Sequence, residues 1–288
     1  MSDETISWTF GKLEATLSTI HEIVPEKGTA FQARLKNFNR LGLPSGVEMR
    51  KGKATQYHVG SIVEMALAVE MTQLGLTPER VVDVISGGWW TTIMAVRLAA
   101  QTLVEHPTGY VDLGGPEPTA VFLFFDPSGL RSLMGPIRRS NPDEGSYHPE
   151  FASNSYTYGT ETILRENIVR LTATTPRMAM VNLTAMLDVL AIFTRSDGEE
   201  TSQEERQTFF QELLDWSTAH TRPYLSGASL APRYYLYFRF IQTVRRDFNL
   251  ADLDALVLKH AAGSGLPEDL VRACLLEYRE GKEFDQWR

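Results

Sequence analysis

Apolar residues recur at helical spacing between residues 29 and 41, and this segment constrains the fold more than any other. Phe31, Leu35, Phe38 and Leu41 are spaced by four, three and three residues, which is typical of the buried stripe of an amphipathic helix. Gly42 follows at once, where a glycine commonly ends a helix because it adopts positive φ without strain. The pattern predicts a helix that packs one face on a core and ends at Gly42.

The other face of this helix is polar and basic. At about 100° per residue, the side chains expected opposite the apolar stripe are Gln32, Lys36, Asn39 and Arg40. Arg34 is expected toward the apolar sector instead. Arg and Lys bind phosphates and guanine edges, whereas Asn and Gln can form paired hydrogen bonds with adenine. These residue types predict a contact with nucleic acid, and the alternative is a polar face that meets only solvent.

A second basic segment follows the helix. Gly46 and Gly52 flank Arg50 and Lys51, with Lys53 just beyond, and such glycines are typical of a hairpin-like turn. Residues 46–55 are termed the basic flap below. Residues 27–58 hold seven Lys or Arg and one Glu, a net charge of +6, although the whole chain carries −8. A local positive patch in an acidic protein can bind a polyanion at one place while the remaining surface repels it.

More helices are expected on both sides of this basic region. An apolar stripe within residues 13–23 predicts a helix that ends before Pro25. Another helix runs from Val59 to Leu74, where a glycine stops it. The next is expected to begin at Pro78 with Thr77 as its N-cap. The predicted order is helix, turn, polar-faced helix, basic flap, helix and capped helix.

This order resembles the winged helix-turn-helix of the MerR family of transcriptional regulators. Residues 36–43, KNFNRLGL, keep a basic residue, one aromatic and the Gly-Leu ending of that family's recognition helix. The flap closes on Tyr57, as the family's wing closes on Tyr, and residues 74–77, LGLT, match the turn after the next helix. The resemblance covers roughly residues 10–88.

The resemblance implies that the chain binds double-stranded DNA and regulates transcription. Because one small module buries little surface, a homodimer that contacts two half-sites is expected. The residues expected at the DNA are Gln32, Arg34, Lys36, Asn37, Asn39, Arg40, Arg50, Lys51, Lys53 and Tyr57. The alternative function is that of a protein-interaction or adaptor protein whose helix-turn-helix core is only structural.

The remaining two thirds predict a fold that is mainly α, with a mixed α/β middle part and a helical C-terminal region. The expected domains are residues 1–88, a winged helix-turn-helix with an N-terminal extension; 89–200, a dimerisation or sensor unit; and 201–288. In the middle part we expect helices at Trp89–Val104 and Thr184–Thr194, strands at Tyr110–Leu113, Thr119–Phe125 and Met178–Leu183, and a loop at Gly135–Tyr158. In the last part we expect a helix that begins at Ser202, then helices at Pro232–Phe248, Leu253–His260 and Pro267–Tyr278.

Several function classes find no support in the sequence. The motifs of nucleophile elbows, phosphate-binding loops and dinucleotide folds are missing, so we expect neither an enzyme nor a cofactor. With one cysteine, Cys274, and six scattered His, a metal site is not expected either. No apolar run is long enough for a membrane span, and the N-terminus is acidic, so we expect a cytoplasmic, nucleoid-associated protein. A small-molecule or protein effector is expected on the C-terminal part.

Overall fold

The computed structural model describes residues 6–47, 55–106, 120–125, 127, 156–161, 178–194, 201–223, 232–233, 235–236, 239–240 and 244–281. The principal helices are α1 (Phe10–Ile20), α2 (Gly28–Arg40), α3 (Val59–Gln73), α4 (Pro78–Gly87), α5 (Trp89–Glu105), α7 (Leu183–Ile192), α8 (Gln203–Pro223), α10 (Leu253–Ser264) and α11 (Glu268–Arg279). Short 3-10 turns lie at Pro25–Lys27 and Leu250–Asp252. The strands are β1 (Ser7–Thr9), β2 (Gln56–His58), β3 (Val121–Phe125), β4 (Tyr156–Thr160) and β5 (Ala179–Asn182).

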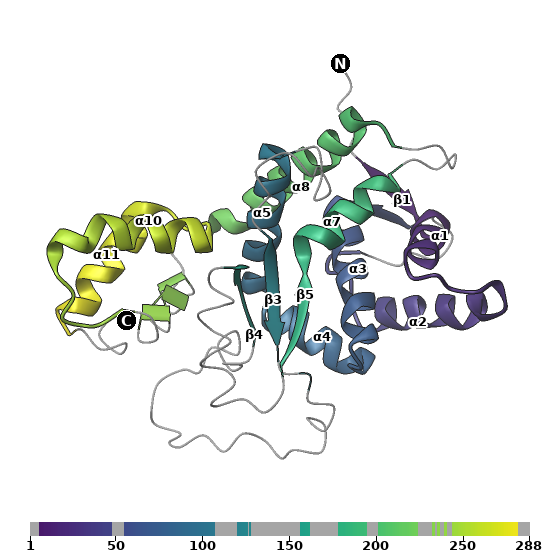
Figure 1. The fold of residues 1–288 in the computed structure, drawn as a ribbon. Helices are drawn as coiled ribbons and strands as arrows, with labels where there is room; N and C mark the ends of the chain where they lie inside the picture. Colours follow the sequence, from purple (N-terminus) through teal and green to yellow (C-terminus); the bar gives the residue numbers. More distant parts are fainter. Residues whose placement is uncertain are drawn as a thin grey trace, which may run out of the picture.

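The described part of the chain is mainly helical with small antiparallel sheets, as the sequence predicted. Figure 1 shows the β4–β3–β5 sheet in the middle, α1 and α2 toward one end, and α10 with α11 at the other. None of the helices described is both long and apolar enough to cross a membrane.

The N-terminal extension contains a strand that the sequence pattern did not predict. β1 pairs antiparallel with β2, and Trp8 lies opposite Tyr57 in the register. Both side chains are buried, while the residues on either side of them are exposed. A directly opposed aromatic pair is a stabilising unit of such a two-stranded ribbon. The ribbon therefore fixes the residues at which the basic flap ends.

The end of α2 follows the predicted stop signal closely. Gly42 has φ +89°, and its N–H donates to the carbonyl of Asn39 over 3.2 Å. The N–H of Leu43 donates to the carbonyl of Phe38 over 3.0 Å, and both of these side chains are buried. This combination is a Schellman motif with its apolar contact. The chain is thereby turned away from the helix axis just before the flap.

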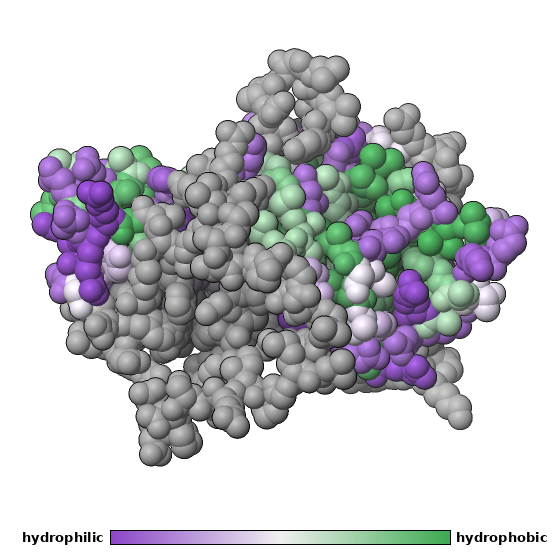
Figure 2. All heavy atoms as spheres, turned by 60° about the horizontal axis from the view of Figure 1, so that its bottom comes forward, coloured by the Kyte–Doolittle hydropathy of each residue, from purple (hydrophilic) through white to green (hydrophobic). Residues whose placement is uncertain are grey.

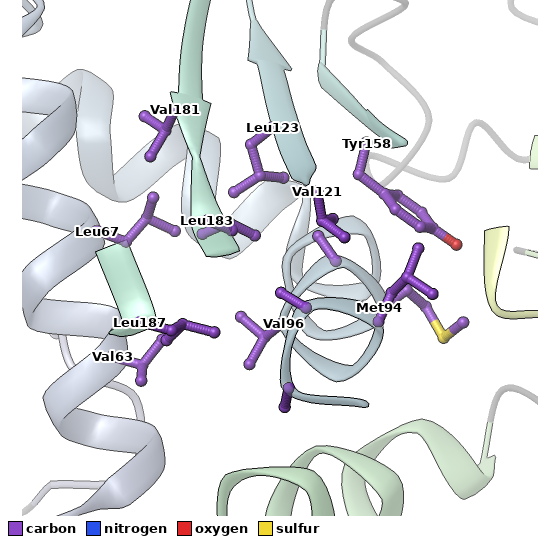
Figure 3. Packing of buried hydrophobic residues seen from close by; sticks show 14 of the residues in the cluster. Val63, Leu67, Met94, Val96, Val121, Leu123, Tyr158, Val181, Leu183 and Leu187 are labelled. Atoms are coloured by element: carbon purple, nitrogen blue, oxygen red, sulfur yellow. The ribbon is translucent and has the colours of Figure 1, made fainter. Parts of the chain in front are cut away.

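The central core is built by helices that precede and follow the sheet in the sequence. α5 is buried along most of its length, and it packs against α7, α8, β3 and β4. Figure 3 shows side chains of α3, α5, α7 and the sheet pointing into this interior, with Leu187 between Val63 and Val96 in that view. The N-terminal helices and the central sheet thus share one hydrophobic cluster.

Helix α8 contacts the N-terminal elements beside the ribbon, just before β1 and just after β2. Glu212 accepts hydrogen bonds from the N–H of Ile6, directly before β1, over 3.0 and 2.8 Å to its two carboxylate oxygens. Trp216 lies against Gly60, where a Cβ would come within 2.1 Å of the indole ring. Near the end of α7, Lys12 Nζ donates to the carbonyl of Thr194. These contacts join Ile6, Lys12 and the start of α3 to α8 and to the residues that follow α7.

In the central part, the sequence located two of the expected strands, which are β3 and β5, and both helices. The expected strand Tyr110–Leu113 lies outside the described residues. So does most of the expected loop Gly135–Tyr158, but its last residues belong to β4, which corrects that prediction. Helix α8 begins directly after Ser202, close to the predicted start, and a capping box forms there because Ser202 and Glu205 exchange hydrogen bonds.

The C-terminal part needs two corrections. The described residues between Pro232 and Phe240 are helical, but residues 244–248 are not. Arg246 lies in this non-helical segment, where its Nε donates to the carbonyl of Tyr278 in the last turn of α11 over 3.1 Å, and its guanidinium lies over the Tyr278 ring. Pro267 is the N-cap of α11 rather than its first helical residue.

Candidate nucleic-acid interface

Helix α2 separates its residues into a buried face and a basic face. Phe31, Leu35 and Phe38 are buried in the core cluster. Three cations of the same helix, Arg34, Lys36 and Arg40, are exposed. The exposure of Arg34 corrects its expected place toward the apolar sector, because its long side chain leaves the edge of the stripe for solvent. Figure 2 shows hydrophilic residues gathered at the end of the molecule where α1 and α2 lie, with apolar residues among them.

Lys36 belongs to a short polar network between α1 and α2. Its Nζ donates to Gln32 Oε1 over 2.6 Å and lies 5.7 Å from the centre of the Phe10 ring. Gln32 Nε2 donates to Glu14 Oε2 over 2.8 Å. Both ends of the Gln32 amide are therefore engaged within the protein. A base contact by Gln32 would require it to leave Glu14, whereas the Lys36 ammonium keeps further donors for a phosphate.

Asn39 and Tyr57 connect α2 to the ribbon. Asn39 Nδ2 donates to the Tyr57 hydroxyl over 2.9 Å, and Tyr57 is fully buried. Burial raises the pKa of Tyr57, which the hydrogen bond from Asn39 lowers in part, so the phenol is neutral. Asn39 is half-buried beside β2 and does not stand on the open face expected for it. The pair holds α2 against the ribbon. The sequence pattern did not predict this hydrogen bond between Asn39 and Tyr57.

A hollow of about 360 Å³ lies beside this pair. It is lined by Thr9, Phe10, Gly11, Lys36, Asn39, Thr55 and Tyr57. The lining comes from α1, α2 and the ends of both ribbon strands. The hollow therefore opens between the basic helix and the point where the flap returns to the fold.

The remaining predicted residues fall into two groups. Asn37 Oδ1 accepts a hydrogen bond from Arg40 over 2.7 Å, which is a pair three residues apart on one helix. The flap residues Arg50, Lys51 and Lys53 lie outside the described part of the chain. The structure does describe both ends of the flap, since Gly46 has φ +75° and Thr55 leads directly into β2.

Sequence patterns did not reveal a buried carboxylate beneath the start of the flap. Glu64 of α3 is 3% exposed and accepts hydrogen bonds from the N–H and the hydroxyl of Ser45, each over 2.9 Å. Burial raises the pKa of Glu64 to about 7, against the opposing effect of the Ser45 hydrogen bonds. One signal was available, because Glu64 is the single acid within the apolar run from Val59 to Val69.

The described residues contain no group of three or more His, Cys, Asp or Glu side chains that could hold a metal ion. Comparisons of the chain with protein-family models, with curated proteins and with solved structures each gave no match. The MerR resemblance thus remains a hypothesis drawn from the sequence motifs.

Proposed function

We propose that the chain is a sequence-specific, double-stranded DNA-binding transcriptional regulator that acts as a dimer. The observation that carries the proposal is that α2 is amphipathic, with one buried apolar face and one exposed basic face. One face packs in the core, the opposite face exposes Lys36 and Arg40, and Arg34 is exposed at the edge of the apolar stripe. A helix held in this way can enter a major groove while its cations contact the flanking phosphates.

The charge distribution supports a polyanion as the partner. The region from residue 27 to residue 58 carries +6 in a chain of −8, so the rest of the chain carries −14. Such a molecule is repelled from DNA in most orientations and attracted in one. The resemblance of residues 10–88 to a MerR winged helix-turn-helix supports the same partner.

The side chains divide between affinity and sequence recognition. Arg34, Lys36 and Arg40 would bind phosphates, because guanidinium and ammonium groups are exposed there. Asn37 would contact bases after releasing Arg40, which now donates a hydrogen bond to its side chain. Asn39 and Tyr57 would act indirectly, since their mutual hydrogen bond orients α2 on the ribbon.

The test is duplex binding as a function of salt concentration. The double variant Lys36→Ala/Arg40→Ala should bind less tightly, and its log–log salt slope should be flatter by about 1.8, which corresponds to two lost phosphate contacts. Lys259→Ala/Arg279→Ala is the matched control, because it removes the same charge from exposed positions on α10 and α11. Equal slopes for both double variants would contradict the proposal.

A protein-interaction or adaptor function is the second candidate, and one surface favours it. A groove of about 360 Å³ with both apolar and polar lining residues lies between α1, α3, β5 and α7. Leu74, Met180 and Val189 line it and are each more than a third exposed. For an adaptor, duplex binding should be weak and insensitive to salt in the wild type and in the α2 variant alike.

A further inference from the structure

Helix α7 lacks the polar outer face that a surface helix normally has. Its one charged residue, Asp188, is buried and paired with Arg206. The three residues of α7 that are not buried are Ala185, Val189 and Ile192, and their spacing of four and three positions places them on one stripe. They are termed the α7 stripe below. A helix that is apolar on all sides is normally buried, so a further surface is expected to cover this stripe.

The α7 stripe borders the groove between α1, α3, β5 and α7, the elements that surround it in Figure 1. Thirteen residues line the groove, and all of them except His21, Glu70 and Asn182 are apolar. Large hydrophobic side chains that are exposed gather on this surface, which contributes four of the seven in the described part of the chain: Leu74, Met180, Val189 and Ile192. Such a concentration is typical of an interaction site.

The charge of the groove indicates the kind of partner. Its lining contains neither Lys nor Arg, and its one acid, Glu70, lies beside His21 with 3.9 Å between Oε1 and Nε2. A basic partner would find little negative charge there, and an acidic partner would be repelled by a chain of net charge −8. The complementary partner therefore presents an uncharged apolar surface. This chain carries such a surface itself, in the α7 stripe next to the groove.

The α7 stripe and the groove can pair twice about one two-fold axis. Because the stripe lies on a wall of the groove, a second copy turned by 180° can place its stripe in this groove while its own groove receives the first stripe. Such a contact closes at two copies. A standard interface involves about 20–30 residues on each side, and the thirteen lining residues with Ile192 supply roughly half of that number as a centre for a polar rim.

We propose that the groove and the α7 stripe form the dimer interface of this protein, and that the partner is a second copy of the chain. The inference rests on the proposed function, which requires a dimer that contacts two half-sites. None of the groove-lining residues belongs to the ten expected at the DNA. Dimerisation through this surface therefore does not use the basic face of α2.

The experiment measures the mass of the whole chain in solution by light scattering coupled to size-exclusion chromatography. Val189→Glu places a charge on the α7 stripe, and Met180→Glu places one in the groove. Leu258→Glu is the matched control, because Leu258 is 56% exposed on α10, which does not line the groove. Circular dichroism establishes that each variant is folded.

We expect dimers for the wild type and for Leu258→Glu. The dimer dissociation constant of Val189→Glu and of Met180→Glu should rise roughly 100-fold or more, because each dimer would bury two charges without partners. If a Glu variant does not fold, Val189→Ser takes its place, with an expected rise of about tenfold for the lost apolar contact. Monomeric Val189→Glu should also show about half the wild-type salt slope in duplex binding, since each binding event then involves one α2 helix instead of two.

The results separate this inference from the proposed function. A monomeric wild type would overturn the interface, even if a different protein occupies the groove. So would folded test variants that dimerise as tightly as Leu258→Glu. If the wild type dimerises through this surface but binds no duplex, the DNA-binding function fails and the interface stands.

Discussion

Replacement of Glu64 by Gln should make the protein more stable at neutral and alkaline pH. In the folded protein the pKa of Glu64 rises from the ordinary 4.5 to about 7 because the carboxyl group is buried. Between these two values the folded chain binds a proton at Glu64 that the unfolded chain does not bind. The free energy of unfolding contributed by this group is therefore present below pH 4.5 and is lost as the pH rises through about 7.

The magnitude follows from the same pKa difference. At about 1.4 kcal/mol per pKa unit, the rise corresponds to about 3 kcal/mol. The neutral amide of the variant resembles the protonated acid in size and charge and does not titrate. The difference in free energy of unfolding between variant and wild type should thus grow by roughly 2–3 kcal/mol between about pH 5 and pH 8.

Urea unfolding at several pH values measures this difference. Glu26→Gln serves as the control for the loss of one negative charge, because Glu26 is exposed on the turn before α2. The free energy of unfolding of Glu26→Gln, plotted against pH, should run parallel to that of the wild type. If the free energy of unfolding of Glu64→Gln also runs parallel to that of the wild type, the Glu64 carboxyl group does not titrate near neutrality. The reasoning from its burial would then be wrong.

Three further outcomes test the packing. Gly60→Ala should destabilise the fold by about 1–3 kcal/mol in thermal unfolding, because its Cβ would meet the Trp216 ring at 2.1 Å. Asp188→Ala should cost about 3–5 kcal/mol, because it leaves the part-buried Arg206 without its ion pair, and adding Arg206→Met should recover part of the loss. Cys274 is buried with its pKa raised to about 12, so iodoacetamide should label it only after unfolding.

Local signals were sufficient for much of the helical structure. The apolar stripe, Gly42 and the Leu43 contact define the end of α2, and Thr77 caps α4 by accepting the N–H of Arg80. These features depend on residues within one helical turn, so a single sequence contains them. The helix predicted to continue to Phe248 failed for the opposite reason. There a contact between Arg246 and Tyr278, distant in sequence, decides the path of the chain.

The candidate site was predictable only in part for the same reason. Helical spacing identified the basic face of α2, and Lys36 and Arg40 are exposed as expected. It could not identify Asn39 as the partner of Tyr57 or Glu64 as the partner of Ser45, since each pair joins residues 18 or 19 positions apart. Such pairs form only once the ribbon and α3 have been packed against α2.

The attachment of α8 to the ribbon has a mechanical consequence. Glu212 accepts hydrogen bonds from the N–H of Ile6 just before β1. Trp216, one helical turn further on, packs against Gly60 just after β2. A displacement of α8 would therefore act on the residue before β1 and on the start of α3 at the same time. Because the hydrogen bond between Asn39 and Tyr57 joins β2 to α2, a change in the position of α8 has a short route through the ribbon to the orientation of α2.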